Sequence, residues 1–162
     1  MTVAEKLVEL LKAYGVTCAT AESCTGGGVG AAITSVAGSS AVFLGGVISY
    51  ANEVKRDVLG VPEQTMATVG AVSSETAAAM AQGARALLRA DIAVSITGIA
   101  GPDGGSVEKP VGLVWFGLAT KAGVRTEKAI FAGDRARVRE QAVVHALGML
   151  TVAAQHHAEA GK

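Results

Sequence analysis

The chain has 162 residues, of which half are hydrophobic and 17% are charged. This length favours one domain over residues 1–162, which can bury about 70% of the surface exposed by the unfolded chain. The 14 basic and 14 acidic residues cancel, and the absence of a basic stripe argues against a nucleic-acid partner. No apolar run approaches the roughly 18 residues of a membrane span. With two cysteines and no signal-peptide pattern at the start, we expect a cytoplasmic protein that has no membrane partner.

Periodicity in the first half of the chain predicts alternating helices and strands. Helical spacing covers residues 3–14 and stops at Gly15, and a β-type run follows at 16–20. A polar stretch and three glycines then lead into a small-residue helix at 29–36. After a turn at 38–40 we expect a strand at 43–50 and a short helix at 51–59, capped by Asn52.

The second half predicts a long helix, a buried strand and a hairpin. Ser73 or Ser74 caps an alanine-rich helix that runs to about Arg89, and residues 92–97 are apolar enough for a central strand. Strands at 111–119 and 125–131 form a hairpin, and a helix over 135–156 closes the chain. This order predicts an α/β fold, a three-layer α/β/α sandwich with a mixed sheet. We attribute the apolar surplus to that sheet and to a subunit interface, hence a homo-oligomer.

The first candidate site is a serine at the junction of a strand and a glycine-rich helix start. The segment is Glu22-Ser23-Cys24-Thr25-Gly26-Gly27. Backbone N–H groups at such a junction can hold an anion or a developing oxyanion, and glycines let a ligand approach closely. A helix-capping serine followed by packing glycines is the competing interpretation.

The second candidate is a lysine that follows a strand. Lys55 comes shortly after Tyr50, and desolvation at a strand end would lower its pKa enough for it to serve as a base toward a serine. Tyr50 would then relay a proton or orient the pair. The competing interpretation places Lys55 on a solvated helix face beside Asp57, where lysines usually lie.

Two further segments have unusual composition. Residues 98–112 form a long loop whose first part is rich in glycine, which is typical of functional loops but also of mobile surface loops. Arg135 and Arg139 lie four apart at the start of the last helix, so they share a face that could grip a phosphate. Cations at a helix N-terminus oppose the macrodipole, which favours an anionic ligand over a merely solvated turn.

The histidines and the second cysteine give no comparable indication of a site. The three histidines all lie in the last predicted helix without a cysteine or acidic cluster at ligand spacing, so we expect no metal and no cofactor. Cys24 adjoins Ser23, but no histidine is tied to it by pattern, which favours a buried thiol over a nucleophile.

Together these segments resemble the CinA C-terminal domain family, also called nicotinamide-nucleotide amidases. The matching segments occur in family order at residues 21–27, 37–40, 50–55, 70–73, 98–105, 109–112 and 133–135. The resemblance covers nearly the whole chain and is to the stand-alone form, without the N-terminal domain that many relatives carry. In the family the residue after Gly27 is often bulkier than Gly28, which would change the shape of the pocket.

The resemblance implies hydrolysis of the carboxamide of nicotinamide mononucleotide, a small-molecule nucleotide substrate, to nicotinic acid mononucleotide and ammonia, without a cofactor. It implies Ser23 as nucleophile, Lys55 as base and Tyr50 as an assisting group. The substrate-binding residues that it implies are Cys24, Thr25, Gly26, Gly27, Gly98, Gly101, Arg135 and Arg139. The alternative is a non-catalytic nucleotide-binding regulatory module linked to competence or DNA damage, which would need no serine with a base in reach.

Overall fold

A mixed sheet of five strands, in the order β2-β1-β3-β4-β5, forms the middle of the molecule. The computed structural model describes residues 1–160. The strands are β1 (Cys18–Glu22), β2 (Phe43–Ile48), β3 (Ile92–Gly98), β4 (Leu113–Thr120) and β5 (Gly123–Ile130). β1 pairs in parallel with both β2 and β3, whereas β4 pairs antiparallel with β3 and with β5. β1 and most of β3 are buried on both faces, which explains their continuous apolar runs.

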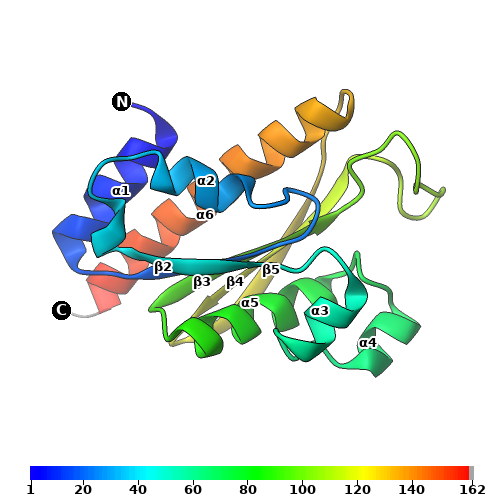
Figure 1. Ribbon diagram of the computed structural model, residues 1–162, viewed down its shortest axis with the longest axis horizontal. Coiled ribbons are helices and arrows are strands. Elements are labelled where there is room, and N and C mark those ends of the chain that lie inside the picture. The colour runs from blue at the N-terminus through cyan, green and yellow to red at the C-terminus, as the bar shows by residue number, and fades with distance from the viewer. Residues whose placement is uncertain (161–162) are drawn as a thin grey trace.

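Helices cover both faces of this sheet (Figure 1). One layer holds α1 (Val3–Tyr14), α2 (Gly28–Thr34) and the long α6 (Arg135–Ala160). The other holds α3 (Asn52–Asp57), α4 (Glu63–Thr68) and α5 (Ser74–Leu88), and a 3-10 turn, η1 (Ser39–Ala41), precedes β2. The larger core lies between the sheet and α1, α2 and α6, and a smaller one lies under α5.

Local chemistry explains where the two best-defined helices begin and end. Thr2 caps α1 in a reciprocal capping box with Glu5, and Gly15 ends the helix in the left-handed conformation. The Ser73 side chain accepts a hydrogen bond from the Thr76 N–H and so caps α5. Gly15 and Ser73 are signals from which the sequence predicts these helices, whereas the capping box at Thr2 was not predicted.

The three-layer α/β/α arrangement with a mixed sheet is confirmed, and the differences are local. α3 begins at Asn52 and its N-cap is Ala51, which makes no side-chain cap, so the prediction that Asn52 caps this helix was wrong. β1 lies two residues later than predicted, β2 ends two residues earlier, and α6 runs to Ala160. α4 was not predicted. Within residues 1–160, no helix has both the length and the apolar character of a membrane span.

Candidate active site

Three parallel strands end at the same edge of the sheet and deliver the polar residues of the site. Ser23 directly follows β1, Ser49 and Tyr50 follow β2, and the loop from Gly98 follows β3. β1 lies between β2 and β3, so the chain leaves β1 toward one neighbour and later returns to the other. Crevices beyond the carboxyl ends of strands at such a switch point are the usual ligand sites of open α/β sheets.

The Lys55 ammonium and the Ser23 hydroxyl meet inside this crevice. Lys55 Nζ lies 3.0 Å from Ser23 Oγ, although the two residues are 32 positions apart in the chain. The Lys55 side chain is only 1% exposed, and it is the largest fully buried side chain of the described residues. The alternative in which Lys55 lies on a solvated helix face is therefore wrong.

Two carbonyl groups fix the orientation of the Lys55 nitrogen. Nζ donates to Ser49 O at 2.7 Å and to Tyr50 O at 3.2 Å. A neutral amine has two N–H groups and one lone pair, so these carbonyls can take both hydrogens and leave the lone pair facing Ser23. Burial lowers the pKa of Lys55, which favours the neutral form. Such an arrangement can accept a proton from a neighbouring hydroxyl group.

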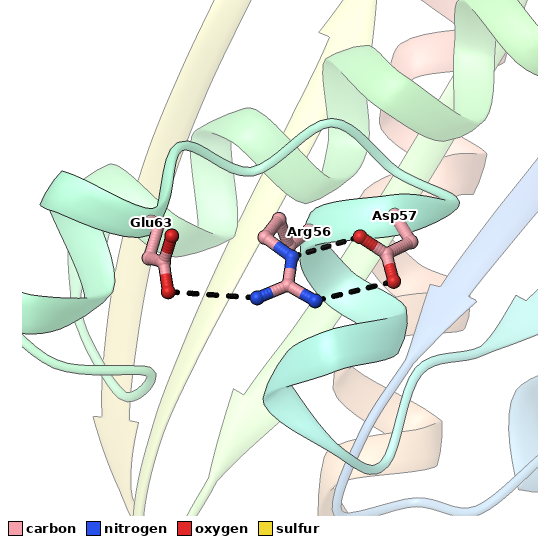
Figure 2. A network of polar contacts seen from close by, with 3 residues as sticks. All are labelled: Arg56, Asp57 and Glu63. Atoms are coloured by element: carbon pink, nitrogen blue, oxygen red, sulfur yellow. Dashed lines mark hydrogen bonds and ion pairs between the residues drawn. The ribbon is translucent and has the colours of Figure 1, made fainter.

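The neighbouring residue on α3 shows the contrast between the two faces of this short helix. Arg56 points to the surface, where its guanidinium pairs with Asp57 at 2.8 Å and with Glu63 of α4 at 3.5 Å (Figure 2). Asp57 is therefore a partner of Arg56 rather than of Lys55. Exposed pairs of this kind add little stability, but the first of them engages Asp57, which lies two positions from Lys55.

A cavity of about 220 Å³ opens beside the pair. Its lining includes Ser23, Cys24, Lys55, Gly98 and Arg135. This volume is below the roughly 300–1,000 Å³ of most ligand pockets, so it holds one ring or a short group while the rest of a larger ligand stays at the mouth.

Tyr50 and Arg135 stand at that mouth. The Arg135 guanidinium donates to Gly101 O at 2.8 Å and to the Tyr50 hydroxyl at 3.1 Å. Tyr50 is 61% exposed, and within residues 1–160 its hydroxyl has no hydrogen bond to Ser23 or Lys55. Gly101 contributes a carbonyl to this arrangement and does not line the cavity.

The remaining predicted binding residues are not among those that line the cavity. Thr25, Gly26 and Gly27 are absent from its lining. Arg139 donates through Nε to Cys24 O at 3.1 Å and through Nη2 to Thr25 O at 3.2 Å, so its guanidinium binds the loop rather than facing the cavity. The prediction that Arg135 and Arg139 together grip one phosphate is not what the geometry shows, because only Arg135 reaches the cavity.

The sequence profile of the family described as "CinA C-terminal domain" matches residues 1–153. The chain belongs to this family. It is 54% identical to the nicotinamide-nucleotide amidohydrolase PncC of Escherichia coli (strain K12), over 93% of this chain and 92% of that one. It is 58% identical to a putative competence-damage inducible protein of Halothermothrix orenii, over 83% of this chain and 33% of the relative.

Solved structures of the family have the same fold. The competence/damage inducible protein CihA from Agrobacterium tumefaciens superposes with a TM-score of 0.91 at 44% identity, covering 94% of this chain and 93% of that one. A CinA superfamily protein from Klebsiella pneumoniae also gives 0.91, at 38% identity and with 95% and 96% coverage.

Three contributors to this candidate site were missed in the sequence. The buried Glu22 carboxylate accepts the N–H groups of Val29 at 2.9 Å and Gly30 at 3.0 Å. These amides at the start of α2 are therefore occupied, whereas the expectation was that they would be free to bind an anion. The only signal for Glu22 was its position directly before Ser23. Asn52 and Thr97 line the cavity, and their places just after β2 and at the end of β3 could have indicated this.

Gly28, which was expected to alter the pocket, is not among the residues that line the cavity. A Cβ at this position would approach Val143 of α6 to 3.0 Å. A larger residue there would therefore change the packing of α2 on α6, whereas the expectation was an altered pocket.

Cys24 also lines the cavity, but its thiol is not activated. Cys18 and Cys24 are free and buried, and burial raises the pKa of the Cys24 thiol to about 11, as expected for a packing thiol. Among residues 1–160 no cluster of three potential metal ligands occurs. A larger cavity of about 410 Å³ lies between the β4–β5 turn and the end of α6, without the serine or the lysine.

Proposed function

We propose that this protein hydrolyses the carboxamide of nicotinamide mononucleotide to nicotinic acid mononucleotide and ammonia. The observation that carries the proposal is the 3.0 Å contact between Lys55 Nζ and Ser23 Oγ, buried at the base of a cavity. A carboxamide is cleaved by a nucleophile with a base in reach, which a binding-only module does not need. The 54% identity to an enzyme named for this reaction supports the choice of substrate.

In the first half of the reaction, the serine replaces the amide nitrogen. The Lys55 lone pair takes the Ser23 proton as Oγ attacks the carboxamide carbon and a tetrahedral oxyanion forms. Unpartnered amides of the Ser23 loop stabilise this oxyanion, at about 3 kcal/mol per donor in comparable enzymes. Collapse breaks the C–N bond, and the Lys55 ammonium protonates the leaving nitrogen, so that ammonia departs and an ester on Ser23 remains.

In the second half, water regenerates the serine. Lys55, neutral again, takes a proton from the attacking water and then returns it to Ser23 Oγ as the ester bond breaks. The product is a carboxylate, and no net proton stays on the enzyme's two groups. Tyr50 already contributes its backbone carbonyl to Lys55. A proton relay through its hydroxyl needs the substrate or a water molecule as a bridge, because the hydroxyl is bonded to Arg135 instead.

We further propose that the pyridine ring enters the cavity and that the ribose phosphate stays at its mouth. Arg135 is exposed there and holds its guanidinium between Gly101 and the Tyr50 hydroxyl. A planar guanidinium fits a phosphate with two parallel hydrogen bonds. Arg135→Met should therefore raise KM more than it lowers kcat.

We also propose that the protein is one domain that acts as a homo-oligomer in the cytoplasm. Apolar side chains of α6 and β2 face outward, with Val144 54% and Ile48 56% exposed. Two free cysteines are compatible with a reducing compartment. Size-exclusion chromatography with light scattering measures the oligomeric state. A monomeric mass at micromolar concentration contradicts that part of the proposal.

The experiment that tests the function is ammonia release from nicotinamide mononucleotide by the purified protein. We expect activity that disappears in Ser23→Ala and in Lys55→Ala, while Lys6→Met, which removes an exposed lysine, retains it. Full activity in Lys55→Ala contradicts the serine–lysine scheme. No ammonia from a folded wild type contradicts the hydrolase, and binding of the same nucleotide by that protein would then favour the regulatory module.

A further inference from the structure

Arg139 holds the loop that carries the nucleophile, from a distance of more than a hundred positions in the chain. It extends from α6 and donates to the carbonyl groups of Cys24 at 3.1 Å and Thr25 at 3.2 Å. A Cβ on Gly26 would lie 3.3 Å from its Nη2, so the guanidinium is packed directly on the loop backbone. No other residue between 1 and 160 makes a side-chain hydrogen bond to these two carbonyls.

The hydrogen bonds of the same loop show which amides remain available. Ser23 N–H donates to Ile96 O, Gly26 N–H to Ser23 O, and Gly28 N–H to Thr25 O. Within residues 1–160 the amides of Cys24, Thr25 and Gly27 have no acceptor. The nucleophile's own N–H, which many hydrolases use to bind an oxyanion, is therefore already occupied here.

Peptide geometry connects the arginine with one of these amides. In a trans peptide the C=O and the following N–H point in opposite directions. Because Arg139 binds the Cys24 carbonyl, the Thr25 N–H points away from the Arg139 guanidinium. α3, which carries Lys55, lies in the layer on the other side of the sheet from α6 (Figure 1).

We propose that Arg139 is a positioning residue that aims the Thr25 N–H at the oxyanion formed on the substrate carbonyl. Its positive charge also polarises the Cys24–Thr25 peptide, which makes that N–H a stronger donor. This assignment rests on the proposed hydrolysis, and it replaces the phosphate role that the position of Arg139 beside Arg135 suggests. It requires that the loss of Arg139 slows the chemical step while substrate binding stays the same.

The test compares Arg139→Met and Arg139→Lys with Arg137→Met. Methionine keeps an apolar stem but has no donor, and lysine restores one cationic donor. Arg137 lies half a turn away on the same helix and pairs with Glu140 on the surface, so it controls for the loss of charge. Initial rates of ammonia release give kcat and KM, and the inhibition constant of nicotinic acid mononucleotide reports nucleotide binding alone.

We expect kcat to fall by about 100-fold in Arg139→Met, as when an oxyanion donor is lost, with KM and the inhibition constant changed less than about threefold. Arg139→Lys should recover part of kcat, and Arg137→Met should match the wild type. A rise in KM and in the inhibition constant with kcat retained overturns the proposal and returns Arg139 to phosphate binding. A lower melting temperature with wild-type kcat in the folded fraction makes Arg139 a purely structural residue and also overturns it.

A second readout separates this proposal from the proposed function. Acylation of Ser23 by p-nitrophenyl acetate forms an oxyanion at the same place without a nucleotide. If the wild type releases no ammonia but is acylated, and Arg139→Met slows the acylation burst, the proposed substrate is wrong and the positioning role stands. An equal burst rate in the wild type and in Arg139→Met overturns the positioning role whatever the substrate.

Discussion

Replacement of Glu22 by glutamine tests how the fold holds the nucleophile in place. The Glu22 side chain is 2% exposed, and its two oxygens accept the N–H groups of Val29 and Gly30. A glutamine keeps one acceptor, so one charge-assisted bond of about 1.5–3 kcal/mol is lost and one buried N–H faces an NH₂ group. Loss of a negative charge at the start of α2 adds about 0.3–1 kcal/mol. We expect Glu22→Gln to lower the free energy of unfolding by about 3 kcal/mol.

Urea denaturation followed by circular dichroism measures this change, and Glu5→Gln is the matched control. Glu5 also accepts a backbone N–H at a helix start, from Thr2 at 3.3 Å, but it is exposed. Glutamine serves equally at that position of a capping box, so a change below about 0.5 kcal/mol is expected there. For a domain of this size a loss of about 3 kcal/mol corresponds to a melting temperature roughly 9 °C lower.

A loss below about 1 kcal/mol in Glu22→Gln would refute the reasoning, because a neutral acceptor would then hold α2 as well as the carboxylate does. An equally large decrease in the free energy of unfolding in Glu5→Gln would refute it as well, because the burial of Glu22 would then make no difference.

Three further predictions concern packing, pH and thiol chemistry. Gly83→Ala should destabilise the protein by at least about 2 kcal/mol, because the new Cβ would lie 1.9 Å from Leu59 O. Gly148→Ala should stabilise it by about 0.5–1 kcal/mol, because a Cβ there meets no atom within 4 Å. Urea denaturation of both variants measures these changes. In the pH profile of kcat/KM, activity should rise with pH as Lys55 loses its proton, with a midpoint below its ordinary pKa of 10.5; a midpoint at or above that value contradicts the desolvated base. Because the pKa of Cys24 is about 11, iodoacetamide should modify it slowly at neutral pH and rapidly after unfolding, and equally fast modification of the native protein is the contrary result.

The sequence predicts most of this fold because its elements carry local signals. Apolar spacing and Gly15 indicate α1 and its end, and Ser73 marks the start of α5. α4 carries no such signal: it is six residues long, has no side-chain cap and buries no residue, so neither periodicity nor capping indicates it. Asn52 was mistaken for a cap because asparagine is favoured at N-caps, whereas the helix already includes Asn52 and has Ala51 as its N-cap.

The site could be predicted only in part, because its contacts depend on strand register. Ser23 and Lys55 stand out as residue types, but their 3.0 Å approach follows from the parallel pairing of β1 with β2, which places Glu22 beside Ile48. The contact of Arg139 with Cys24 spans 115 positions. Periodicity showed that Arg139 shares a helix face with Arg135, and it could not show that this face meets the back of the nucleophile loop.

Burial of Lys55 predicts how the stability of the protein changes with pH. Its pKa is lowered in the folded protein, so between that pKa and 10.5 the unfolded chain binds a proton that the folded chain does not. Stability from this group therefore rises with pH across the window, and each unit of lowering costs about 1.4 kcal/mol below it. In Lys55→Met this pH dependence should be lost, although the Ser49 and Tyr50 carbonyls lose their donor at every pH.

The measurement is the free energy of unfolding of the wild type and of Lys55→Met at intervals from neutral to alkaline pH. The free energy of unfolding of the wild type should increase relative to that of the variant as pH rises, because Lys55 is deprotonated in the folded chain while it is still protonated in the unfolded chain. The hydrogen bonds lost in the variant lower its free energy of unfolding by the same amount at every pH. The decisive quantity is therefore the slope, against pH, of the difference between the two free energies. Lys6→Met, at an exposed position, should give a flat difference. A flat difference for Lys55→Met as well would mean that Lys55 keeps its proton in the folded state, and the neutral base required for attack by Ser23 would be absent.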